Sequence, residues 1–494
     1  MTDAYFQPFR ENVIGDGLLF PTPYGEKQLL YADWIASGRL YAPIEQTFLN
    51  DIYPYCGNTH TETSVTGTIM TRLYHDAKEV IKKAVNAHAD DALIFSGSGM
   101  TDSINKLQRI MGLRMPDALQ YRYGHSSQHW HLPEADKPVV FITHMEHHSN
   151  HTSWLETIAD VEIIQPDEAG LPDLNYFHDL LKKYASRKTK IASVSAASNV
   201  TGVITPYYEI AEMIHAVGGI IIVDFACSGP YVHIDMHPDN EAQVLDAIVL
   251  SPHKFLGGPG TPGLLVMNQA LYQSKSPDHA GGGTVVFTSP WHEHRYIVNI
   301  EEREDGGTPP FLQGIKAAMA FRLKDTMGVA NILGREAQQI ERVMQRLLPV
   351  KGLHVLESHL RHRVGAVSFY VEGMHYNLGV KLLNDMFGIQ VRGGCACAGT
   401  YGHFLLNIDK AQSDHILACV MAGDITARPG WIRLSLHPVI SDAELERILD
   451  AIVYVAENHE TLGQDYNFLP KKNAFEHKHF QRVFEQNITE RLFA

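Results

Sequence analysis

Short apolar runs recur along the chain, and many of them end in turns rich in Gly, Ser or Asn. Such runs are typical of the buried strands of a parallel sheet, which helices cover on both faces. The pattern predicts strands at residues 93–96, 139–143, 161–164, 191–195, 218–224, 244–250 and 264–267.

Longer stretches between and after these runs predict helices. Residues 66–88 form an amphipathic pattern, and residues 311–347 form a long helical stretch that leads into the C-terminal part. Residues 364–371 alternate between apolar and polar positions, which is typical of a half-buried strand. Strands that alternate with helices, followed by a smaller mixed region, predict the α/β fold class.

Lys254 stands just past one predicted strand, in a stretch rich in Gly and Pro that runs from residue 251 to 263. Glycines allow positive φ angles and the close approach of another group. A partly desolvated lysine in such a place suits a Schiff base with a carbonyl compound. A surface lysine in a turn is the alternative, and this stretch alone does not decide between the two interpretations.

Asp224 ends the predicted strand at residues 218–224. Ligands of parallel sheets bind at the carboxyl ends of the strands. An Asp at one strand end and Lys254 past the next suit pyridoxal phosphate (PLP): the lysine holds the aldehyde, and the carboxylate keeps the pyridine nitrogen protonated. An Asp in this position is also a common helix cap, so the pair carries the hypothesis and Asp224 alone does not.

With these motifs the chain resembles the class V, fold-type I PLP enzymes, and within them the cysteine desulfurases and selenocysteine lyases, from about Tyr31 to about Ala456. The resemblance implies a large domain with a seven-stranded, mostly parallel sheet and a smaller α+β C-terminal domain. It divides the chain into an N-terminal arm packed on the small domain (1–50), in which residues 29–33 resemble the opening strand of the family, a large PLP-binding domain (51–325) and a small domain with a C-terminal tail (326–494).

The resemblance also assigns contacts to the cofactor. A Gly/Ser turn precedes a predicted helix near residue 100, where backbone N–H groups and the helix dipole suit a phosphate. His147, the first histidine of a Glu-His-His run, would stack on the pyridine ring and could move protons near pH 7. The expected cofactor set is Gly99, Met100, Thr101, His147, Asn199, Asp224, Cys227, Ser251, His253, Lys254 and Thr308.

Two members of this set have particular consequences. Cys227 stands where the family usually has a Gln that shares the phenolic oxygen of the cofactor with Asn199, and a thiol is a weaker donor. Thr308, after Gly306 and Gly307, resembles the loop that reaches the phosphate of a neighbouring subunit, which implies a homodimer with shared sites. A simple turn is the alternative for that loop.

Residues 391–399 contain two cysteines, Cys395 and Cys397. In an extended segment, side chains two residues apart face the same side, so composition does not choose between them. The family desulfurases carry their nucleophilic cysteine on a loop here, five residues after an arginine, which corresponds to Arg392 and selects Cys397.

The resemblance assigns substrate contacts to three more positions. Arg433 matches the arginine that binds the substrate carboxylate in a bidentate manner. Arg392 and His60 complete the expected substrate set, although His60 is equally well interpreted as a helix-entry residue. The 35 residues between Cys397 and Arg433 exceed the family spacing, which indicates an insertion, including residues 401–409, that covers the active site.

Composition excludes several classes of protein. The net charge of -15 argues against nucleic-acid binding, which needs a basic surface. No apolar run approaches the ~20 residues of a membrane span, and the N-terminus does not have the pattern of a signal peptide. Five cysteines in 494 residues do not indicate a disulfide framework. We therefore expect a cytoplasmic protein with free thiols.

Three functions are compatible with these residues. The preferred one removes sulfur or selenium from cysteine or selenocysteine, leaves a persulfide on Cys397, releases alanine and passes the sulfur to an acceptor protein or thiol. The second is another class V reaction on an amino acid, such as transamination, epimerisation or elimination. The third is zinc binding by Cys395, Cys397 and His403, which lacks a fourth ligand. The histidine-rich residues 124–131 are expected to form an inserted surface loop, with a metal site as the less favoured alternative.

Overall fold

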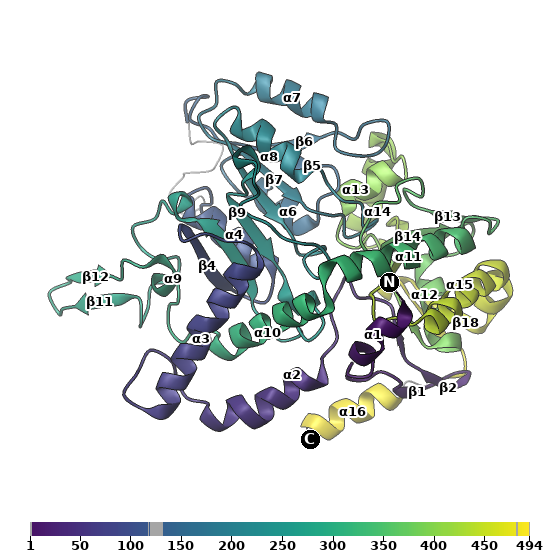
Figure 1. Ribbon diagram of the computed structural model, residues 1–494. Helices are drawn as coiled ribbons and strands as arrows, with labels where there is room; N and C mark the ends of the chain where they lie inside the picture. Colours follow the sequence, from purple (N-terminus) through teal and green to yellow (C-terminus); the bar gives the residue numbers. More distant parts are fainter. Residues whose placement is uncertain (1, 117, 119–131, 481–482, 494) are drawn as a thin grey trace. The chain divides into compact units, whose positions relative to one another are not determined.

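The computed structural model describes residues 2–116, 118, 132–480 and 483–493 (Figure 1). Its chain divides into two compact units. The large unit comprises residues 37–198 and 203–333, and the small unit comprises residues 1–36, 199–202 and 334–494. The domain boundaries expected at residues 50 and 325 stay a prediction. The histidine-rich stretch 124–131 lies outside the described residues.

The large unit is built on a seven-stranded sheet with the order β4-β10-β9-β8-β7-β5-β6. Strand β10 is antiparallel to β4 and β9, and the pairs from β9 to β6 are parallel. This confirms the predicted α/β fold with a mostly parallel sheet. The strands are β4 (Asp91–Ser96), β5 (Val139–Thr143), β6 (Asp160–Ile164), β7 (Lys190–Ser195), β8 (Ile220–Asp224), β9 (Ala247–Leu250) and β10 (Gly263–Asn268).

Helices cover both faces of this sheet, which explains why its strands are apolar on both sides. On one face, Val140 and Ile142 belong to a buried cluster with side chains of α4 and α6. On the other face, Phe141 packs edge-on against Phe177 of α7, with ring centroids 5.4 Å apart. The helices of the large unit named here are α3 (Val65–Ala84), α4 (Met100–Ile110), α6 (His148–Leu155), α7 (Leu174–Lys183), α8 (Tyr207–His215) and α10 (Phe311–Met327).

The long helical stretch expected at residues 311–347 consists of two helices. Helix α10 lies beside α3 (Figure 1) and ends at Gly328, and α11 (Val329–Leu347) begins directly after it. Gly328 has a φ of 78°, a left-handed conformation that ends a helix readily because glycine has no Cβ. The predicted helical content is therefore confirmed, but the sequence reading missed the break.

A two-stranded hairpin, β11 (Val285–Thr288) and β12 (His294–Tyr296), projects from the large unit (Figure 1). Its first strand, its turn and the residues after it expose large apolar side chains, among them Phe287, Trp291 and Val298. Sequence reasoning did not predict this hairpin.

The small unit contains a four-stranded antiparallel sheet with the order β13-β14-β17-β16. The strands are β13 (Leu353–Val355), β14 (Ala366–Val371), β16 (Arg392–Gly394) and β17 (Trp431–Ser435). Strand β3 (Leu30–Tyr31), near the N-terminus, pairs in parallel with β15 (Ile389–Gln390). The helices include α1 (Asp3–Arg10), α12 (Tyr376–Phe387), α13 (Gly399–Leu405), α14 (Lys410–Met421), α15 (Asp442–Leu462) and α16 (Val483–Phe493).

Both ends of the chain add a hairpin to the small unit. The first is formed by β1 (Leu19–Thr22) and β2 (Gly25–Gln28), and the second by β18 (Tyr466–Leu469) and β19 (Ala474–His477). The C-terminal stretch expected only as a polar tail therefore has regular structure. In the described part of the chain, no helix is long and apolar enough to cross a membrane.

Candidate functional site

Lys254 lies at the carboxyl end of β9, in a short 3-10 turn that begins at Pro252. A segment around Gly38, far earlier in the chain, packs closely against this turn. Gly38 donates its N–H to the carbonyl oxygen of His253 at 2.9 Å, and a Cβ added to Gly38 would lie 1.9 Å from the carbonyl oxygen of Phe255. Only glycine fits there without a shift of the backbone. Sequence reasoning missed this support of the lysine turn.

Lys324 on α10 supports the same region from a buried position. Its Nζ donates to the carbonyl oxygen of Gly229 at 2.8 Å and to that of Val232, and it lies 5.7 Å from the ring centroid of Phe255. Burial lowers the pKa of Lys324 to about 7, and the charge of Asp325 opposes that shift. The lysine thus joins the segment after β8 to the segment after β9.

Asp224, at the end of β8, is buried with 4% of its surface exposed. Burial raises the pKa of this carboxyl to about 7. The N–H of Ala226, which donates to Asp224 Oδ1 at 2.7 Å, and the charge of Lys254 act in the opposite direction. A protonated ring nitrogen beside Asp224 would supply the positive charge that favours the ionised carboxylate.

Glu146 is a second buried carboxyl at this edge of the sheet. It accepts hydrogen bonds from Thr143 Oγ1 (2.6 Å), Asn150 Nδ2 (2.8 Å) and the N–H and Oγ of Ser195 (3.0 and 2.6 Å). Burial raises the pKa of Glu146, and these donors oppose the shift. The negative charge of Glu146 also raises the pKa of Asp224. The sequence motif that contains Glu146 did not indicate a role for this carboxyl.

His147 caps the N-terminus of α6. Its Nδ1 accepts the N–H of Ser149 at 3.1 Å, so this ring nitrogen carries no proton. The hydroxyl of Ser149 in turn lies 2.7 Å from Thr101 Oγ1 on α4. The cap thus fixes a ring tautomer of His147 in which Nδ1 is unprotonated, and links α6 to the start of α4.

The start of α4 forms a cradle with the turn after β9. Met100 donates its N–H to Ser251 Oγ at 2.9 Å. A Cβ added to Gly99 would lie 3.1 Å from Ser251 Oγ and 3.6 Å from His253 Nε2. Burial lowers the pKa of His253 to about 4, and Lys254 adds to that shift, so this histidine is neutral near pH 7. The cradle suits an anion because the helix N-terminus supplies a positive dipole end and N–H groups.

These observations fit PLP. The cradle of Gly99, Met100 and Ser251 suits its phosphate, the buried carboxyl of Asp224 suits its protonated ring nitrogen, and Lys254 supplies an amine for its aldehyde. Cys227 is 5% exposed, and its Sγ donates to the carbonyl oxygen of Ser198 at 3.5 Å. The assignment of each residue to the cofactor stays a prediction.

Thr308 and His60 are both exposed in the large unit. The loop of Thr308 follows buried Asp305, which pairs with Lys78 Nζ at 3.0 Å and accepts the hydroxyl of Tyr74 at 2.8 Å. His60 has a φ of 65°, which is rare for a residue with a side chain. The expected contacts of Thr308 with a partner subunit and of His60 with the substrate stay predictions.

In the small unit, Asp33 joins the two predicted substrate-binding arginines. Its Oδ1 accepts from Arg433 Nη2 at 2.8 Å, and its Oδ2 accepts from Arg392 Nε at 3.0 Å. Arg433 is almost fully buried and also donates to the carbonyl oxygen of Asn199 at 3.0 Å, whereas half of the Arg392 side chain is exposed. Sequence reasoning placed Asp33 in an opening strand and missed its link to both arginines.

Cys395 and Cys397 lie in a tight turn. Ala398 donates its N–H to the carbonyl oxygen of Cys395 at 3.0 Å. The two residues between Cys395 and Ala398 are both left-handed, Ala396 with a φ of 52° and Cys397 with a φ of 55°. This is the signature of a type I′ turn, which normally selects Gly, Asn or Asp. Because this segment is a turn, the rule that side chains two residues apart face one side of an extended segment does not apply to the two cysteines.

The turn is strained and clamped. A left-handed conformation costs about 1–2 kcal/mol for a residue with a Cβ, and such strain concentrates at functional sites. Asn199 Nδ2 donates to the carbonyl oxygen of Ala396 at 2.7 Å, and Asn199 Oδ1 has no hydrogen-bond partner in the described part of the chain. One amide hydrogen of Asn199 is therefore engaged by the cysteine turn, and the other can still donate. The predicted bond of Asn199 to the cofactor stays a prediction.

The segment after the cysteines forms α13 and α14. Tyr401 is buried, with its hydroxyl 3.3 Å from Thr201 Oγ1. Both ring nitrogens of His403 have local partners, Gly399 O at 2.7 Å and Ser413 Oγ at 2.9 Å. Within the described residues no group of three or more His, Cys, Asp or Glu side chains could hold a metal. The geometry therefore does not support the zinc interpretation, and cover of the active site by this insertion stays a prediction.

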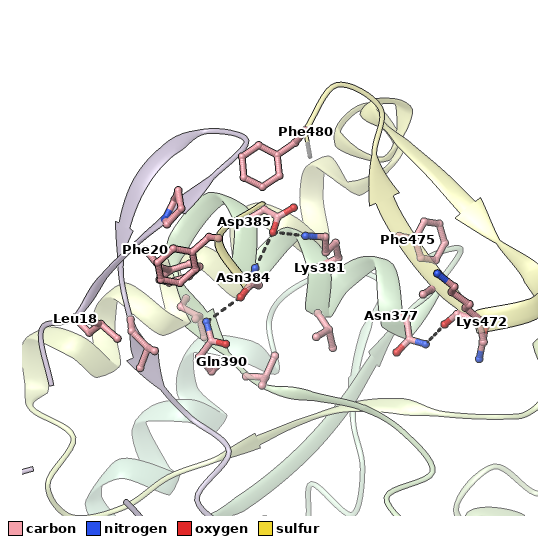
Figure 2. A pocket seen from close by; sticks show the side chains of 18 residues that line it. Leu18, Phe20, Asn377, Lys381, Asn384, Asp385, Gln390, Lys472, Phe475 and Phe480 are labelled. Atoms are coloured by element: carbon pink, nitrogen blue, oxygen red, sulfur yellow. Dashed lines mark hydrogen bonds and ion pairs between the residues drawn. The ribbon is translucent and has the colours of Figure 1, made fainter. Parts of the chain in front are cut away.

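A cavity of about 630 Å³ lies on the small unit and is lined in part by β15 (Figure 2). Helix α12 contributes Lys381, Asn384 and Asp385, and Lys381 Nζ pairs with Asp385 Oδ1 at 2.6 Å. Helix α12 forms the floor of the cavity. Phe20 of the first hairpin and Phe475 of the last hairpin line opposite sides of that floor. Sequence reasoning gave no signal for this cavity, because its walls come from the two ends of the chain.

Comparison with known proteins identifies the family to which this chain belongs. The family model "Aminotransferase class-V" matches residues 30–448. A probable cysteine desulfurase from Halalkalibacterium halodurans is 29% identical over 379 residues, which cover 75% of this chain and 84% of the relative. A probable cysteine desulfurase from Streptomyces coelicolor is 26% identical over 434 residues, which cover 87% of this chain and 92% of the relative.

Solved structures show the same fold. The apo structure of a cysteine desulfurase from Thermococcus onnurineus NA1 has a TM-score of 0.71 at 21% identity and covers 91% of this chain and 98% of its own. A cysteine desulfurase from Escherichia coli has a TM-score of 0.66 at 19% identity, with coverage of 92% and 99%. The family match spans most of the chain and contains both the lysine turn and the cysteine turn. The protein therefore belongs to the class-V aminotransferase family and is a PLP-dependent enzyme.

Proposed function

We propose that the enzyme removes sulfur from L-cysteine, or selenium from L-selenocysteine, and forms alanine and a persulfide on Cys397. The observation that carries the proposal is the exposed Cys397 thiol on a clamped, strained turn whose preceding strand begins with Arg392. The relatives that match most of this chain are named probable cysteine desulfurases, which supports the same reaction.

The residues of the large unit would hold and tune the cofactor. Lys254 Nζ would bind its aldehyde, Asp224 would hold a proton on its ring nitrogen, and the N-terminus of α4 would bind its phosphate. When bound, PLP supplies an electron sink that weakens the bonds at the α-carbon of the amino acid. His147, with Nδ1 unprotonated, can stack on a ring without placing a second cation there.

The residues of the small unit would act on the rest of the substrate. Arg433 and Arg392 would bind the substrate carboxylate, and Asp33 orients both guanidinium groups. Lys254 Nζ would take the α-proton, and the thiolate of Cys397 would attack the substrate sulfur. The carbon–sulfur bond then breaks with its electron pair going to carbon, which is protonated to give alanine, while the sulfur stays on Cys397.

One observation keeps a second class V reaction in view. Cys227 replaces the usual Gln, and its thiol donates to the backbone of Ser198. Because a thiol is a weak donor, the phenolic oxygen of the cofactor would depend more on Asn199, which alters the electronics of the ring. Transamination, epimerisation or elimination of another amino acid is the corresponding alternative.

The test is a product analysis of the holoenzyme with L-cysteine and a reducing thiol. Alanine and sulfide should form in equal amounts, and Cys397→Ser should form neither above background although it keeps the absorbance of bound PLP. Pyruvate or another keto acid without alanine, or undiminished turnover by Cys397→Ser, would replace desulfuration by the alternative. Cys419→Ser, which changes another free cysteine of the small unit, is the matched control.

The same proposal includes the partners and location of the enzyme. A homodimer is supported by the exposed loop of Thr308 and by the exposed apolar side chains Phe287 and Trp291 on the neighbouring hairpin. A sulfur-acceptor protein or thiol follows from the persulfide, which must be unloaded before the next turnover. A cytoplasmic location is supported by the five free cysteines, because a nucleophilic thiol needs a reducing compartment.

A further inference from the structure

Cys395 is the feature of this site that the proposed reaction does not use. It occupies the first position of the type I′ turn that carries Cys397 at its third position. Two residues apart along the chain, their Cα atoms lie at most about 7.6 Å apart, and folding of the turn shortens this span. Disulfides join Cα atoms up to about 6.8 Å apart, so thiols in such a turn can reach one another by rotation about χ1.

The two thiols have different surroundings. Cys397 interacts electrostatically with Arg392. Burial lowers the pKa of this guanidinium, whereas Asp33, Tyr31 and Cys397 raise it. Their combined effect is larger, so the pKa of Arg392 is raised. Cys395 interacts with Tyr376 at the start of α12. Burial raises the pKa of this phenol, the hydrogen bond from Asn473 opposes that shift, and of two weaker effects the charge of Cys395 raises the pKa and the charge of Arg428 lowers it. A cation therefore lies near Cys397, and a phenol lies near Cys395.

The position of Cys395 is fixed by its neighbours. Strand β16 packs directly on α12, because a Cβ added to Gly393 would lie 2.7 Å from Asn377 Oδ1 and 3.1 Å from the Tyr376 ring. Tyr376 accepts a hydrogen bond from Asn473 Nδ2 at 2.8 Å, and Asn199 clamps the carbonyl of Ala396 at 2.7 Å. The turn is thus held from both sides.

We propose that Cys395 is a second sulfur-carrying residue, which takes the outer sulfur atom from the Cys397 persulfide before that atom passes to an external acceptor. The proposal rests on the proposed desulfurase function. The thiolate of Cys395 attacks the outer sulfur of Cys397–S–SH, a new sulfur–sulfur bond forms on Cys395, and the old bond breaks with its electron pair going to Cys397. No oxidant or reductant is consumed, because one thiolate and one persulfide give one persulfide and one thiolate.

The direction of the transfer follows from the charges. Cys397 regains a negative charge as it leaves, and the guanidinium of Arg392 stabilises that charge, which makes Cys397 the better leaving group. The transfer also frees Cys397 for the next substrate molecule while the sulfur waits on Cys395. A persulfide on Cys395, which is only partly exposed, is also less open to unspecific thiols than one on exposed Cys397.

The experiment follows the sulfur atom by mass. The holoenzyme is mixed with ³⁴S-labelled L-cysteine, quenched with an alkylating reagent at successive times and digested, and peptide fragmentation locates the label. In the unaltered enzyme the label should reach Cys397 first and Cys395 later. In Cys395→Ser it should stay on Cys397, and unloading to dithiothreitol should become about tenfold faster, because the persulfide stays on the exposed thiol. Cys419→Ser should behave as the unaltered enzyme.

The outcomes separate the two proposals. Label that stays on Cys397 alone at all times in the unaltered enzyme, with unloading unchanged in Cys395→Ser, overturns the relay and leaves the desulfurase function in place. Label on neither cysteine and no alanine overturns the desulfurase function and the relay with it. Label on Cys395 in Cys397→Ser overturns the order of transfer, because Cys395 would then take sulfur from the substrate directly.

Discussion

Asn199 Nδ2 donates a hydrogen bond of 2.7 Å to the carbonyl oxygen of Ala396, the residue between the two cysteines. The two residues are 197 positions apart in the chain, so a side chain from the middle of the sequence holds the shape of the nucleophile turn. Because the two left-handed residues of that turn are strained, the turn depends on contacts of this kind.

Asn199→Asp should therefore be more harmful than Asn199→Ala. Alanine removes a hydrogen bond with a net contribution of about 1 kcal/mol, whereas aspartate adds an acceptor that repels the carbonyl of Ala396. Both variants should form less persulfide on Cys397, measured by alkylation and mass spectrometry. Asn467→Asp, at an exposed position of β18, is the control and should match the unaltered enzyme. Equal persulfide in all three would contradict the clamp.

Lys254→Ala should abolish turnover and the covalent retention of PLP. Lys254 is the lysine on the turn after β9, so borohydride treatment of the variant followed by denaturation should leave no cofactor on the protein. Lys275→Ala, which removes an exposed lysine of the large unit, should keep the reducible link. If PLP stayed covalently attached to Lys254→Ala after this treatment, another amine of the protein would bind the aldehyde of PLP.

The stability of the cofactor-free protein should fall as the pH rises from about 4 to about 7, and Asp224 should cause part of that fall. Burial raises the pKa of Asp224 from 3.8 to about 7, so in this window the folded chain holds a proton that the unfolded chain has lost. The stabilisation is complete below pH 4 and lost above pH 7. Asp224→Asn, which stays neutral, should lose this dependence in urea unfolding at pH 5 and pH 8.

The bound cofactor gives the control for that prediction. A pyridinium beside Asp224 stabilises the ionised carboxylate, so addition of PLP should stabilise the unaltered protein more than Asp224→Asn at pH 8. The same pH dependence in Asp224→Asn and in the unaltered protein would assign the titration to another group.

Asp33→Asn should destabilise the small unit by about 3 kcal/mol, because it leaves the buried guanidinium of Arg433 without its carboxylate. Asp414→Asn is the matched control: it removes an ion pair with Lys410 that is exposed on α14 and should cost less than about 1 kcal/mol. Denaturant unfolding of both variants makes the comparison. A small effect of Asp33→Asn would mean that Arg433 finds another partner.

Gly38→Ala should disturb the lysine turn. The added methyl group would lie 1.9 Å from the carbonyl oxygen of Phe255, and backbone atoms must move to relieve that overlap. The variant should bind PLP more weakly, as measured by its absorbance after dialysis. Gly282→Ala places a methyl group in open space and should bind PLP normally. Equal PLP retention would show that the support of the turn is dispensable.

The sequence predicted those features that depend on local pattern. Residues 139–143 form β5 with the expected bounds, because an apolar run between turn residues has few alternatives in a two-faced sheet. The strand expected from residue 244 begins at Ala247, because the three residues before it lead out of a short 3-10 turn. The seven strands of the large sheet followed from the same signal, whereas α6, α7 and α8 were not predicted.

Features set by distant contacts could not be predicted in this way. Asp33 and Arg433 are 400 positions apart, and nothing in either segment indicates their ion pair. Ala396 and Cys397 are left-handed although neither is a usual turn residue, so nothing in their local sequence indicated the type I′ turn. The strain is maintained by Asn199, which the sequence associated with the cofactor alone.

The cavity on the small unit has a consequence for any shortened form of the protein. Its walls include Phe20, which precedes the family match, and Phe475, which follows it, whereas Ile389 and α12 lie inside the match. A protein trimmed to residues 30–448 would keep the chemistry-bearing segments but would expose to water the apolar side chains of Val380, Ile389 and Val391, which line the cavity in the full chain. We expect that form to aggregate, and fusion partners at either end to be tolerated only beyond these hairpins.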